Sequence, residues 1–384
     1  MKEVKRAKYR VGIIGCGSHG TRLGRAFNLN PLTEVVAGVN RSQEGLDLFC
    51  SRFGVPGYKD YAEMLVKEEI DIAAPILPVK HNPQAVIDCA RAGVKGIFCD
   101  KPIAASLVEA DEMVEECRRL GVPVVAGDME RNDPVMWEAR EMVESGEIGE
   151  VLSINVYGTG SNQVSGQGCR SFTDMAMFTG DAEIDWVVGW VTGYAADPKL
   201  GTVDEWSDND QQMGGYVRFV NGIEAFLHHR TAPGKSGIEV LGTEGIFFRD
   251  SSTREYRIWK KKNGELEDLS DMFGSPDQAG YGSEKYDDDG WYVLRKRTTD
   301  SVQAIVNAVE SEARPRCSDD DLRKALEIPI ALRESHRRGH AAVKLPLEDR
   351  SLKIIPCTRR WIGRRFLDAG MEGFMNHLAS ATNF

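Results

Sequence analysis

A glycine-rich turn after an apolar run constrains this chain more than any other stretch. The run Val11–Ile14 leads into a G-x-G-x-x-G turn, and a helix is expected to begin within residues 21–28. This order is typical of a dinucleotide-binding unit, because the helix N-terminus offers N–H groups to a pyrophosphate; the alternative is an ordinary βα turn. The residues expected to contact a cofactor at this turn are Gly15, Gly17, Ser18, His19 and Gly20.

The end of the second expected strand bears on the choice of cofactor. The apolar run Val35–Val39 ends at Asn40 and Arg41, where proteins that bind NAD usually have an acidic residue for the ribose 2′-hydroxyl. A neutral Asn40 removes repulsion toward a 2′-phosphate, and Arg41 can pair with one, so the sequence predicts NAD(P) with a slight preference for NADP. The alternative is that Asn40 binds the ribose of NAD while Arg41 faces water.

Strand-like and helical stretches alternate through the first third of the chain. Helices are expected over residues 44–53, 61–67, 81–92 and 106–120, and strands over residues 71–78, 96–99 and 122–126. The alternation predicts right-handed βαβ units and a parallel sheet that binds ligands at the carboxyl ends of its strands. The fold class is therefore α/β, with an N-terminal Rossmann domain.

Lys101 is the strongest candidate for a catalytic residue. It lies in Asp100-Lys101-Pro102, directly after a buried strand and at the sheet edge where the cofactor is expected. An amine at this place can hydrogen-bond a substrate hydroxyl and accept its proton as hydride leaves the carbon. From position alone, a surface lysine is the more common interpretation.

Several motifs, taken in order, resemble the Gfo/Idh/MocA oxidoreductases, relatives of glucose–fructose oxidoreductase and inositol dehydrogenase. They are the glycine turn, Ile76-Leu77-Pro78 with His81, Asp100-Lys101-Pro102, residues 127–134 with Arg131, the run 139–151, and residues 239–245. The resemblance covers about residues 9 to 349. It implies NAD(P)-dependent oxidation of a sugar or polyol hydroxyl, or the reverse, with Lys101 as the catalytic lysine. It also implies further cofactor contacts at Leu77, Pro78, His81, Asp100 and Lys101.

The resemblance also implies a domain organisation. Residues 1–130 are the Rossmann domain, residues 131–349 a substrate-binding and oligomerisation α/β domain with a large, mainly antiparallel open sheet, and residues 350–384 an extension beyond it. The open sheet implies a homodimer or homotetramer. Strand-like runs with short turns between them support an antiparallel sheet. They cover residues 151–157, 186–194, 212–220, 224–230, 237–241, 246–248 and 254–259, with a long loop over 271–291 and helices over 172–179, 301–310 and 319–337.

The segment that should carry the family's second catalytic group departs from the pattern. Where the family has Asp or Asn, then His, then Asp, this chain aligns Gly166, Arg170 and Thr173. Arg170 is too basic for a general base, but it can hold a carboxylate or phosphate, stabilise an alkoxide, or form an ion pair between domains. Asp174 can supply a carboxylate, although a helix turns it about 100° from Thr173. The remaining candidates for substrate binding are Tyr157, Asn162 and Gln167.

Composition narrows the class of protein. The chain has 384 residues, enough for two domains, and its net charge of −11 disfavours nucleic acid or an anionic membrane as a partner. No apolar run approaches the ~18 residues of a membrane span, and the basic N-terminus lacks the apolar stretch of a signal peptide. Eight cysteines without a C-x-x-C pair indicate reduced thiols in a cytoplasmic protein, and the scattered histidines predict no metal site.

Together these observations predict an NAD(P)-dependent oxidoreductase that acts on a hydroxyl of a sugar, polyol or sugar acid. An anionic substrate would best explain Arg170. Two alternatives stay open: a cofactor-retaining enzyme that cleaves glycosidic bonds by transient oxidation, and a non-catalytic protein that binds a nicotinamide cofactor.

Overall fold

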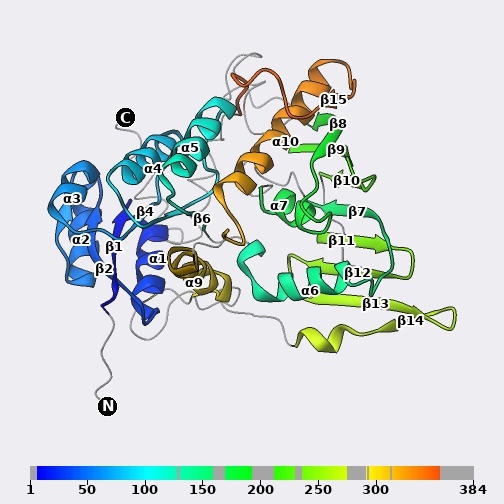
Figure 1. Ribbon diagram of the computed structural model, residues 1–384, viewed down its shortest axis with the longest axis horizontal. Coiled ribbons are helices and arrows are strands. Elements are labelled where there is room, and N and C mark those ends of the chain that lie inside the picture. Colours follow the sequence, from blue (N-terminus) through cyan, green and yellow to red (C-terminus); the bar gives the residue numbers. More distant parts are fainter. Residues whose placement is uncertain are drawn as a thin grey trace, which may run out of the picture.

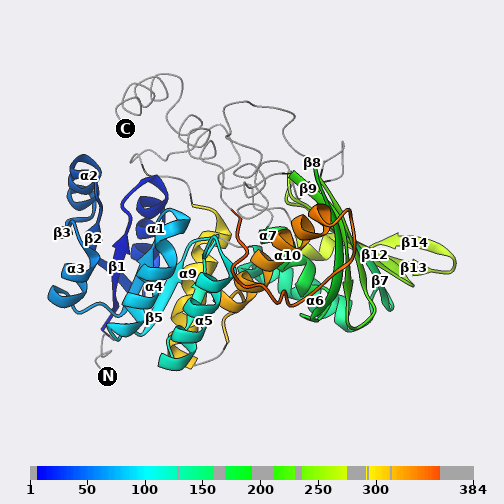
Figure 2. The same ribbon diagram turned by 90° about the horizontal axis from the view of Figure 1, so that it is seen from above.

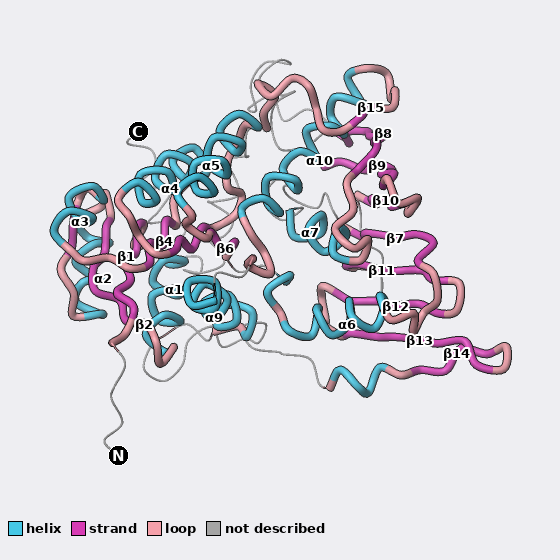
Figure 3. The backbone as a smooth tube through the Cα atoms, viewed as in Figure 1, coloured by secondary structure: helices cyan, strands magenta, loops and turns pink. Residues whose placement is uncertain are grey.

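The computed structural model describes residues 7–127, 130–158, 169–192, 212–229, 236–274, 291, 294–311 and 314–354. These residues form two sheets at opposite ends of an elongated molecule, with helices between and around them (Figure 1). Figure 3 separates helices from strands by colour and shows the strands of the second sheet stacked in one long row. Within these residues, no helix combines the length and apolar character needed to cross a bilayer.

The first sheet has six strands, all parallel, in the order β3-β2-β1-β4-β5-β6. The strands are β1 (Tyr9–Ile14), β2 (Thr33–Val39), β3 (Gly57–Tyr58), β4 (Ile72–Pro75), β5 (Gly96–Cys99) and β6 (Val124–Ala126). The helices between them are α1 (Ser18–Leu29), α2 (Gln43–Phe53), α3 (Tyr61–Lys67), η1 (Val79–His81), α4 (Asn82–Arg91) and α5 (Leu107–Leu120). This arrangement confirms the predicted Rossmann domain; only the short strand β3 was not predicted.

Local sequence explains where these helices begin and end. Ser106 caps α5 in a capping box with Glu109, and Gly121 ends the helix in the left-handed conformation. The strands are apolar on both faces because helices cover both sides of the sheet. Phe98 of β5 is fully buried, and its ring meets Phe27 of α1 edge to face at 5.5 Å.

The second sheet has nine strands in the order β14-β13-β12-β11-β7-β10-β9-β8-β15. The strands are β7 (Val151–Tyr157), β8 (Ile184–Thr192), β9 (Gln212–Phe219), β10 (Glu224–His228), β11 (Gly237–Gly242), β12 (Gly245–Asp250), β13 (Tyr256–Lys262), β14 (Glu265–Asp268) and β15 (Val343–Lys344). Every neighbouring pair is antiparallel except β10 and β7, which are parallel. The predicted, mainly antiparallel sheet is confirmed, whereas β14 and β15 were not predicted.

Helices cover one face of the second sheet. They are α6 (Pro134–Glu144), α7 (Cys169–Met177) and α10 (Asp319–Arg337), and Figure 2 shows all three on the side that faces the first domain. No described helix lies on the opposite face. The short helices η2 (Glu130–Asn132) and η5 (Ser270–Phe273) lie in connections.

Some element boundaries differ from those expected. Helix α1 begins at Ser18 and α7 at Cys169, both earlier than predicted, whereas β13 begins after Arg254, whose φ of +63° interrupts an extended strand. The loop expected over residues 271–291 begins with η5, and residues 275–290 lie outside the described part of the chain.

After β14 the chain returns to the first domain, and the expected division at residues 130 and 349 stays a prediction. Helix α9 (Lys296–Ser311) packs on α1, β5 and β6, where Val302 and Ile305 join the core around Phe98. Residues 350–354 pair with residues 105–108, because the Ile354 amide donates to the Ala105 carbonyl at 2.8 Å. The physical reason for the return of α9 is that β5 and β6 present apolar residues around Phe98, which α1 and α9 cover together.

Candidate active site

The glycine turn leaves one side open for a cofactor. Gly15 has a φ of +108°, and a Cβ at this residue would overlap the carbonyl oxygen of Ile76. A Cβ at Gly20 would overlap the carbonyl oxygen of Gly15. At Gly17, by contrast, no atom lies within 4 Å of the Cβ position. Gly17 is also the N-cap of α1, so no side chain caps the first N–H groups of the helix and they can bind an anion.

His19 connects the glycine turn to the loop that carries Lys101. Its Nε2 lies 3.4 Å from Asp100 Oδ1, and its Nδ1 lies 2.7 Å from Arg22 Nη2. Ser18 and His19 are the first residues of α1, while Asp100 follows β5. The structure therefore brings together predicted cofactor residues from two separate parts of the first domain.

Lys101 lies directly beyond β5, at the carboxyl edge of the first sheet. Its side chain is only 5 % exposed, which contradicts the interpretation of a surface lysine. Asn82 Nδ2 donates to the Pro102 carbonyl at 3.2 Å and lies 3.4 Å from the Asp100 carbonyl oxygen, so the start of α4 holds this loop. A buried amine at this edge can reach a substrate that lies against the glycine turn.

The loop after β4 borders the same turn. Leu77 Cδ2 lies 3.5 Å from the position of a Cβ at Gly15. At the end of η1, partial desolvation lowers the pKa of His81, and the positive charges of Lys80 and Arg41 lower it further. The predicted cofactor residues of this loop are Leu77, Pro78 and His81.

Asn40 and Arg41 lie between β2 and α2. Asn40 Nδ2 is 3.3 Å from the Ser42 carbonyl, and Ser42 caps α2 by accepting from the Gly45 amide. The Arg41 side chain is exposed. Because α2 begins here, an anion at this place would meet a helix N-terminus as well as the guanidinium of Arg41.

A buried charge cluster lies where the first sheet meets the second domain. Glu130 of η2 follows β6, and its carboxylate lies 2.5 Å from Arg297 Nη1, 3.4 Å from Arg170 Nε and 3.5 Å from Arg249 Nη2. These arginines come from α9, α7 and β12, so one carboxylate joins three elements to the end of the first sheet. The charge cluster consists of Glu130, Arg131, Arg170, Asp174, Arg249 and Arg297.

Arg131 is the most buried cation of the charge cluster. It is 2 % exposed, and its Nη1 lies 2.7 Å from Asp181 Oδ1, while its Nη2 lies 3.6 Å from Asp321 Oδ1. Burial alone would raise the pKa of Asp181, but Arg131 and Arg140 hold that pKa below its ordinary value. These ion pairs link η2 to α10 and to the segment after α7, which is a structural role.

Arg170 and Asp174 both lie on α7 and both belong to the charge cluster; the helix was predicted only from residue 172, so it includes Arg170 because it begins earlier. The ion pair of Arg170 with Glu130 is the alternative role that the sequence left open, so substrate binding by Arg170 stays a prediction. Asp174 is 4 % exposed, and its Oδ1 has no hydrogen-bond partner in the described part of the chain. Burial raises the pKa of Asp174 to about 7 against the opposing charge of Arg249, and Glu130 adds to the rise.

Tyr157 lies on the other face of the second sheet. Ile154 and Val156 pack in the core beneath α7, so the alternation of a strand directs Tyr157 to the opposite face. There its hydroxyl donates to Glu239 Oε2 at 3.0 Å, and burial together with this bond raises the pKa of Tyr157 to about 12. Tyr157 and Arg170 thus lie on opposite sides of the sheet, and substrate binding by Tyr157 stays a prediction. Asn162 and Gln167 lie outside the described residues.

Sequence reasoning missed Glu130, Arg249 and Arg297. Glu130 and Arg297 are 167 positions apart, so no spacing in the sequence predicts their contact. The only local signal is that Glu130 lies four positions after the last parallel strand, near the sheet edge where ligand-binding residues are expected.

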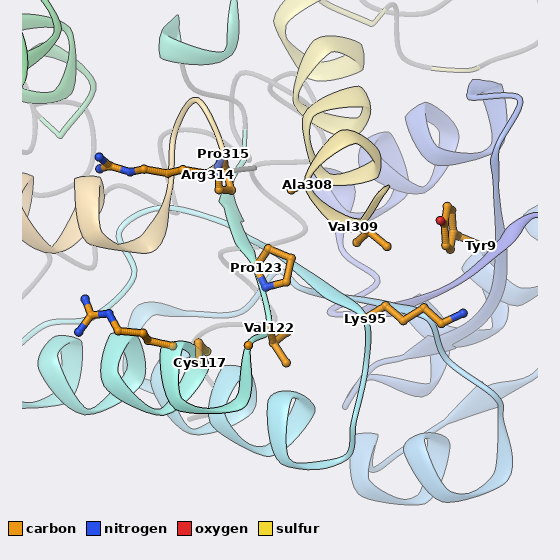
Figure 4. A pocket seen from close by; sticks show the side chains of 11 residues that line it. Tyr9, Lys95, Cys117, Val122, Pro123, Ala308, Val309, Arg314 and Pro315 are labelled. Carbon is orange, nitrogen blue, oxygen red and sulfur yellow. The ribbon is translucent and has the colours of Figure 1, made fainter. Parts of the chain in front are cut away.

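A hollow of about 630 Å³ lies at the amino edge of the first sheet, opposite the glycine turn. Figure 4 shows Tyr9 at the start of β1, Lys95 before β5 and Pro123 before β6 around it. Lys95 is already paired with Asp71, 2.8 Å away, and Figure 4 shows its side chain extended toward Tyr9. Ligands of parallel sheets bind at the carboxyl edge, so this hollow is not the cofactor site.

Comparison with known proteins identifies the first domain. A family model described as "Oxidoreductase family, NAD-binding Rossmann fold" (GFO_IDH_MocA) matches residues 9–128. The match covers the first domain of the chain. The resemblance found in the sequence is therefore confirmed, together with the predicted fold class and the prediction of an oxidoreductase with a nicotinamide cofactor.

Named relatives act on sugars and polyols. The chain is 27 % identical over 330 residues to dTDP-3,4-didehydro-2,6-dideoxy-alpha-D-glucose 3-reductase of Actinomadura kijaniata. The aligned region covers 82 % of this chain and 92 % of that protein. The chain is also 31 % identical over 144 residues to myo-inositol 2-dehydrogenase of Thermotoga maritima. This aligned region covers 37 % of this chain and 42 % of that protein. An oxidoreductase from Agrobacterium radiobacter, whose structure was solved in complex with NAD⁺, L-tartaric acid and magnesium, has the same fold. The two structures superimpose with a TM-score of 0.69 and 18 % sequence identity, over 88 % of this chain and 98 % of that one.

Proposed function

We propose that this protein is an NAD(P)-dependent oxidoreductase that oxidises a hydroxyl of a sugar, polyol or sugar acid, or catalyses the reverse reduction. The observation that carries the proposal is the buried Lys101 at the carboxyl edge of the first sheet, on the loop that Asp100 joins to the glycine turn. The open side of Gly17 and the uncapped N-terminus of α1 fit a pyrophosphate. The activities named for the relatives support the substrate class.

In this mechanism Lys101 handles the proton of the reacting hydroxyl. When bound, the nicotinamide ring takes up or delivers the hydride. In its neutral amine form Lys101 Nζ accepts the hydroxyl proton during oxidation and becomes an ammonium group, and in reduction the ammonium returns that proton to the alkoxide oxygen. Arg170 remains a cation throughout, so it orients a substrate carboxylate or phosphate instead of replacing the family's histidine as a base.

The test is cofactor reduction by the purified protein, with NAD and NADP separately, across neutral sugars, polyols and sugar acids. We expect repeated turnover with one of these classes. Lys101→Met should lower kcat by about 10²–10⁴-fold and leave the Kd of NAD(P)H unchanged, because the change removes the proton acceptor and not the glycine turn. Lys95→Met, at the opposite edge of the same sheet, is the matched control.

Full turnover by the Lys101→Met variant would refute the mechanism. Cofactor binding without turnover on any compound would favour a non-catalytic nicotinamide-binding protein. Cleavage of glycosides with the cofactor retained and no net reduction would favour transient oxidation.

We infer a slight preference for NADP over NAD from the edge beyond β2. Arg41 and Lys80 lie near His81, and the N-terminus of α2 adds a positive dipole end. The Kd values of NADH and NADPH test this. Arg41→Ala should weaken NADPH binding by about tenfold with little effect on NADH, whereas Lys67→Ala, an exposed lysine on α3, should change neither. A strong preference of the native protein for NADH would contradict the inference.

We further propose a cytoplasmic homodimer or homotetramer that assembles through the face of the second sheet on which no described helix lies. That face carries Trp190 and Phe226, which are 39 % and 38 % exposed. Tyr216 lies beside Phe226 with ring centroids 5.4 Å apart, and Trp186 lies 5.1 Å from Tyr216. Such an aromatic face is typical of an interface. Sedimentation velocity measures the assembly, and a monomer at all concentrations would contradict it.

A further inference from the structure

Asp174 is a buried carboxyl within reach of the candidate substrate-binding arginine. It lies four residues after Arg170 on α7, so the two side chains share one face of the helix. Asp174 is 4 % exposed, and its Oδ1 is fully covered without accepting a hydrogen bond from any described residue. A covered oxygen without a donor stabilises the protonated form of a carboxyl group, because the charged form has lost its water.

Charged groups surround Asp174 from every element packed against it. On its own helix lies Arg170, on β12 Arg249, and on η2 both Glu130 and Arg131. Cys317, two residues before α10, is near enough to interact with Asp174, and Asp321 of α10 contributes through its ion pair with Arg131. The described groups that act on the carboxyl are Glu130, Arg131, Arg170, Arg249 and Cys317, and Asp321 acts only through Arg131.

The two protonation states of Asp174 leave different charges beside Arg170. When Asp174 is neutral, Glu130 is the carboxylate that Arg170 and Arg249 share. When Asp174 is ionised, a second carboxylate attracts the same guanidinium groups and reduces their attraction for any other anion. The pKa of about 7 means that both states are populated near neutral pH.

We propose that Asp174, by gaining and losing a proton, sets how strongly the Arg170 end of the active site attracts an anionic substrate. The proposal rests on the function proposed above and adds that the substrate carries a carboxylate or phosphate. Acidification neutralises Asp174 and strengthens binding of the anion, whereas the affinity for a neutral sugar does not change. Asp174 is therefore a positioning residue that acts through Arg170 and makes no contact with the reacting atoms.

The binding experiment uses a matched pair of sugars and calorimetric titration of the full chain loaded with NADP. The probes are D-galacturonate, which stays ionised throughout, and D-galactose, at about pH 6 and about pH 8. We expect the Kd of galacturonate to be about tenfold higher at the more alkaline pH, and the Kd of galactose to be unchanged. Asp174→Asn should bind galacturonate with the tighter Kd at both pH values.

Asp319→Asn is the control variant. Like Asp174, Asp319 is a buried carboxyl whose pKa lies near neutral pH, but it lies outside the charge cluster. Burial also raises the pKa of Asp319, to about 7, at the start of α10. This variant should keep the pH dependence of galacturonate binding. A pH-independent Kd in the native protein, or the same loss of pH dependence in both variants, overturns the proposal.

An infrared titration gives a readout that does not depend on substrate. The carbonyl stretch of protonated carboxyl groups should lose intensity between about pH 6 and about pH 8 in the native protein, and part of that change should be missing in Asp174→Asn. An unchanged difference spectrum overturns the proposal. Failure to bind galacturonate at any pH also overturns it, while turnover of a neutral sugar in the same preparation would leave the proposed oxidoreductase standing.

Discussion

Asp319 makes the stability of this protein depend on pH, by an amount that can be worked from its surroundings. It is the first residue of α10, and burial raises its pKa from 3.8 to about 7. The Asp320 amide donates to Asp319 Oδ1 at 3.0 Å, which lowers the pKa of Asp319. The negative charges of Asp320 and Asp321 raise that pKa further. In the folded protein this carboxyl therefore keeps its proton at a pH where the unfolded chain has lost it.

A carboxyl group whose pKa is raised on folding stabilises the folded protein in acid. This stabilisation is lost as the pH rises through the pKa that the group has in the folded protein. The shift is about 3 pH units at about 1.4 kcal/mol each, which limits the whole effect to about 4 kcal/mol. Roughly half of it, about 2 kcal/mol, falls between about pH 5.5 and about pH 8. Asp319→Asn removes the titrating group and with it this part of the pH dependence.

The assay is urea unfolding of the native protein and of Asp319→Asn at these two pH values. On going from the acidic to the alkaline pH, the native protein should lose about 2 kcal/mol more free energy of unfolding than the variant. Asp349→Asn is the matched control, because Asp349 is exposed and hydrogen bonds from Ser351 lower its pKa, so it stays ionised throughout. Equal losses in the native protein and in Asp319→Asn would refute the reasoning.

Two substitutions in the glycine turn should separate folding from cofactor binding. Gly17→Ala places a methyl group in open space, so the urea midpoint of unfolding should stay unchanged. The Kd of NAD(P)H, measured by fluorescence titration, should rise by about tenfold or more, because the methyl group keeps the pyrophosphate from approaching the backbone closely. Gly20→Ala forces a methyl group onto the carbonyl oxygen of Gly15, so unfolding should need about 1–3 kcal/mol less, whether or not cofactor is present. An equal loss of stability in both variants would contradict the assignment of Gly17 to the cofactor.

Features that depend on residues close in the sequence could be predicted. The glycine turn, the strands of the first sheet and helix α10, which spans Asp319–Arg337 as expected, follow from apolar periodicity, capping residues and the conformational freedom of glycine. Lys101 could be placed at the carboxyl edge of the sheet because parallel strands all end there. These rules act over a few residues, and for that reason they need no knowledge of the rest of the fold.

Contacts between distant segments needed the tertiary structure. Nothing in the sequence pairs Glu130 with Arg297 or brings α9 back onto the first sheet, since such contacts depend on which apolar faces are still uncovered when the elements pack. The same packing buries Lys101. Burial and charge at a site are sums over neighbours from several elements, so only the assembled fold decides them.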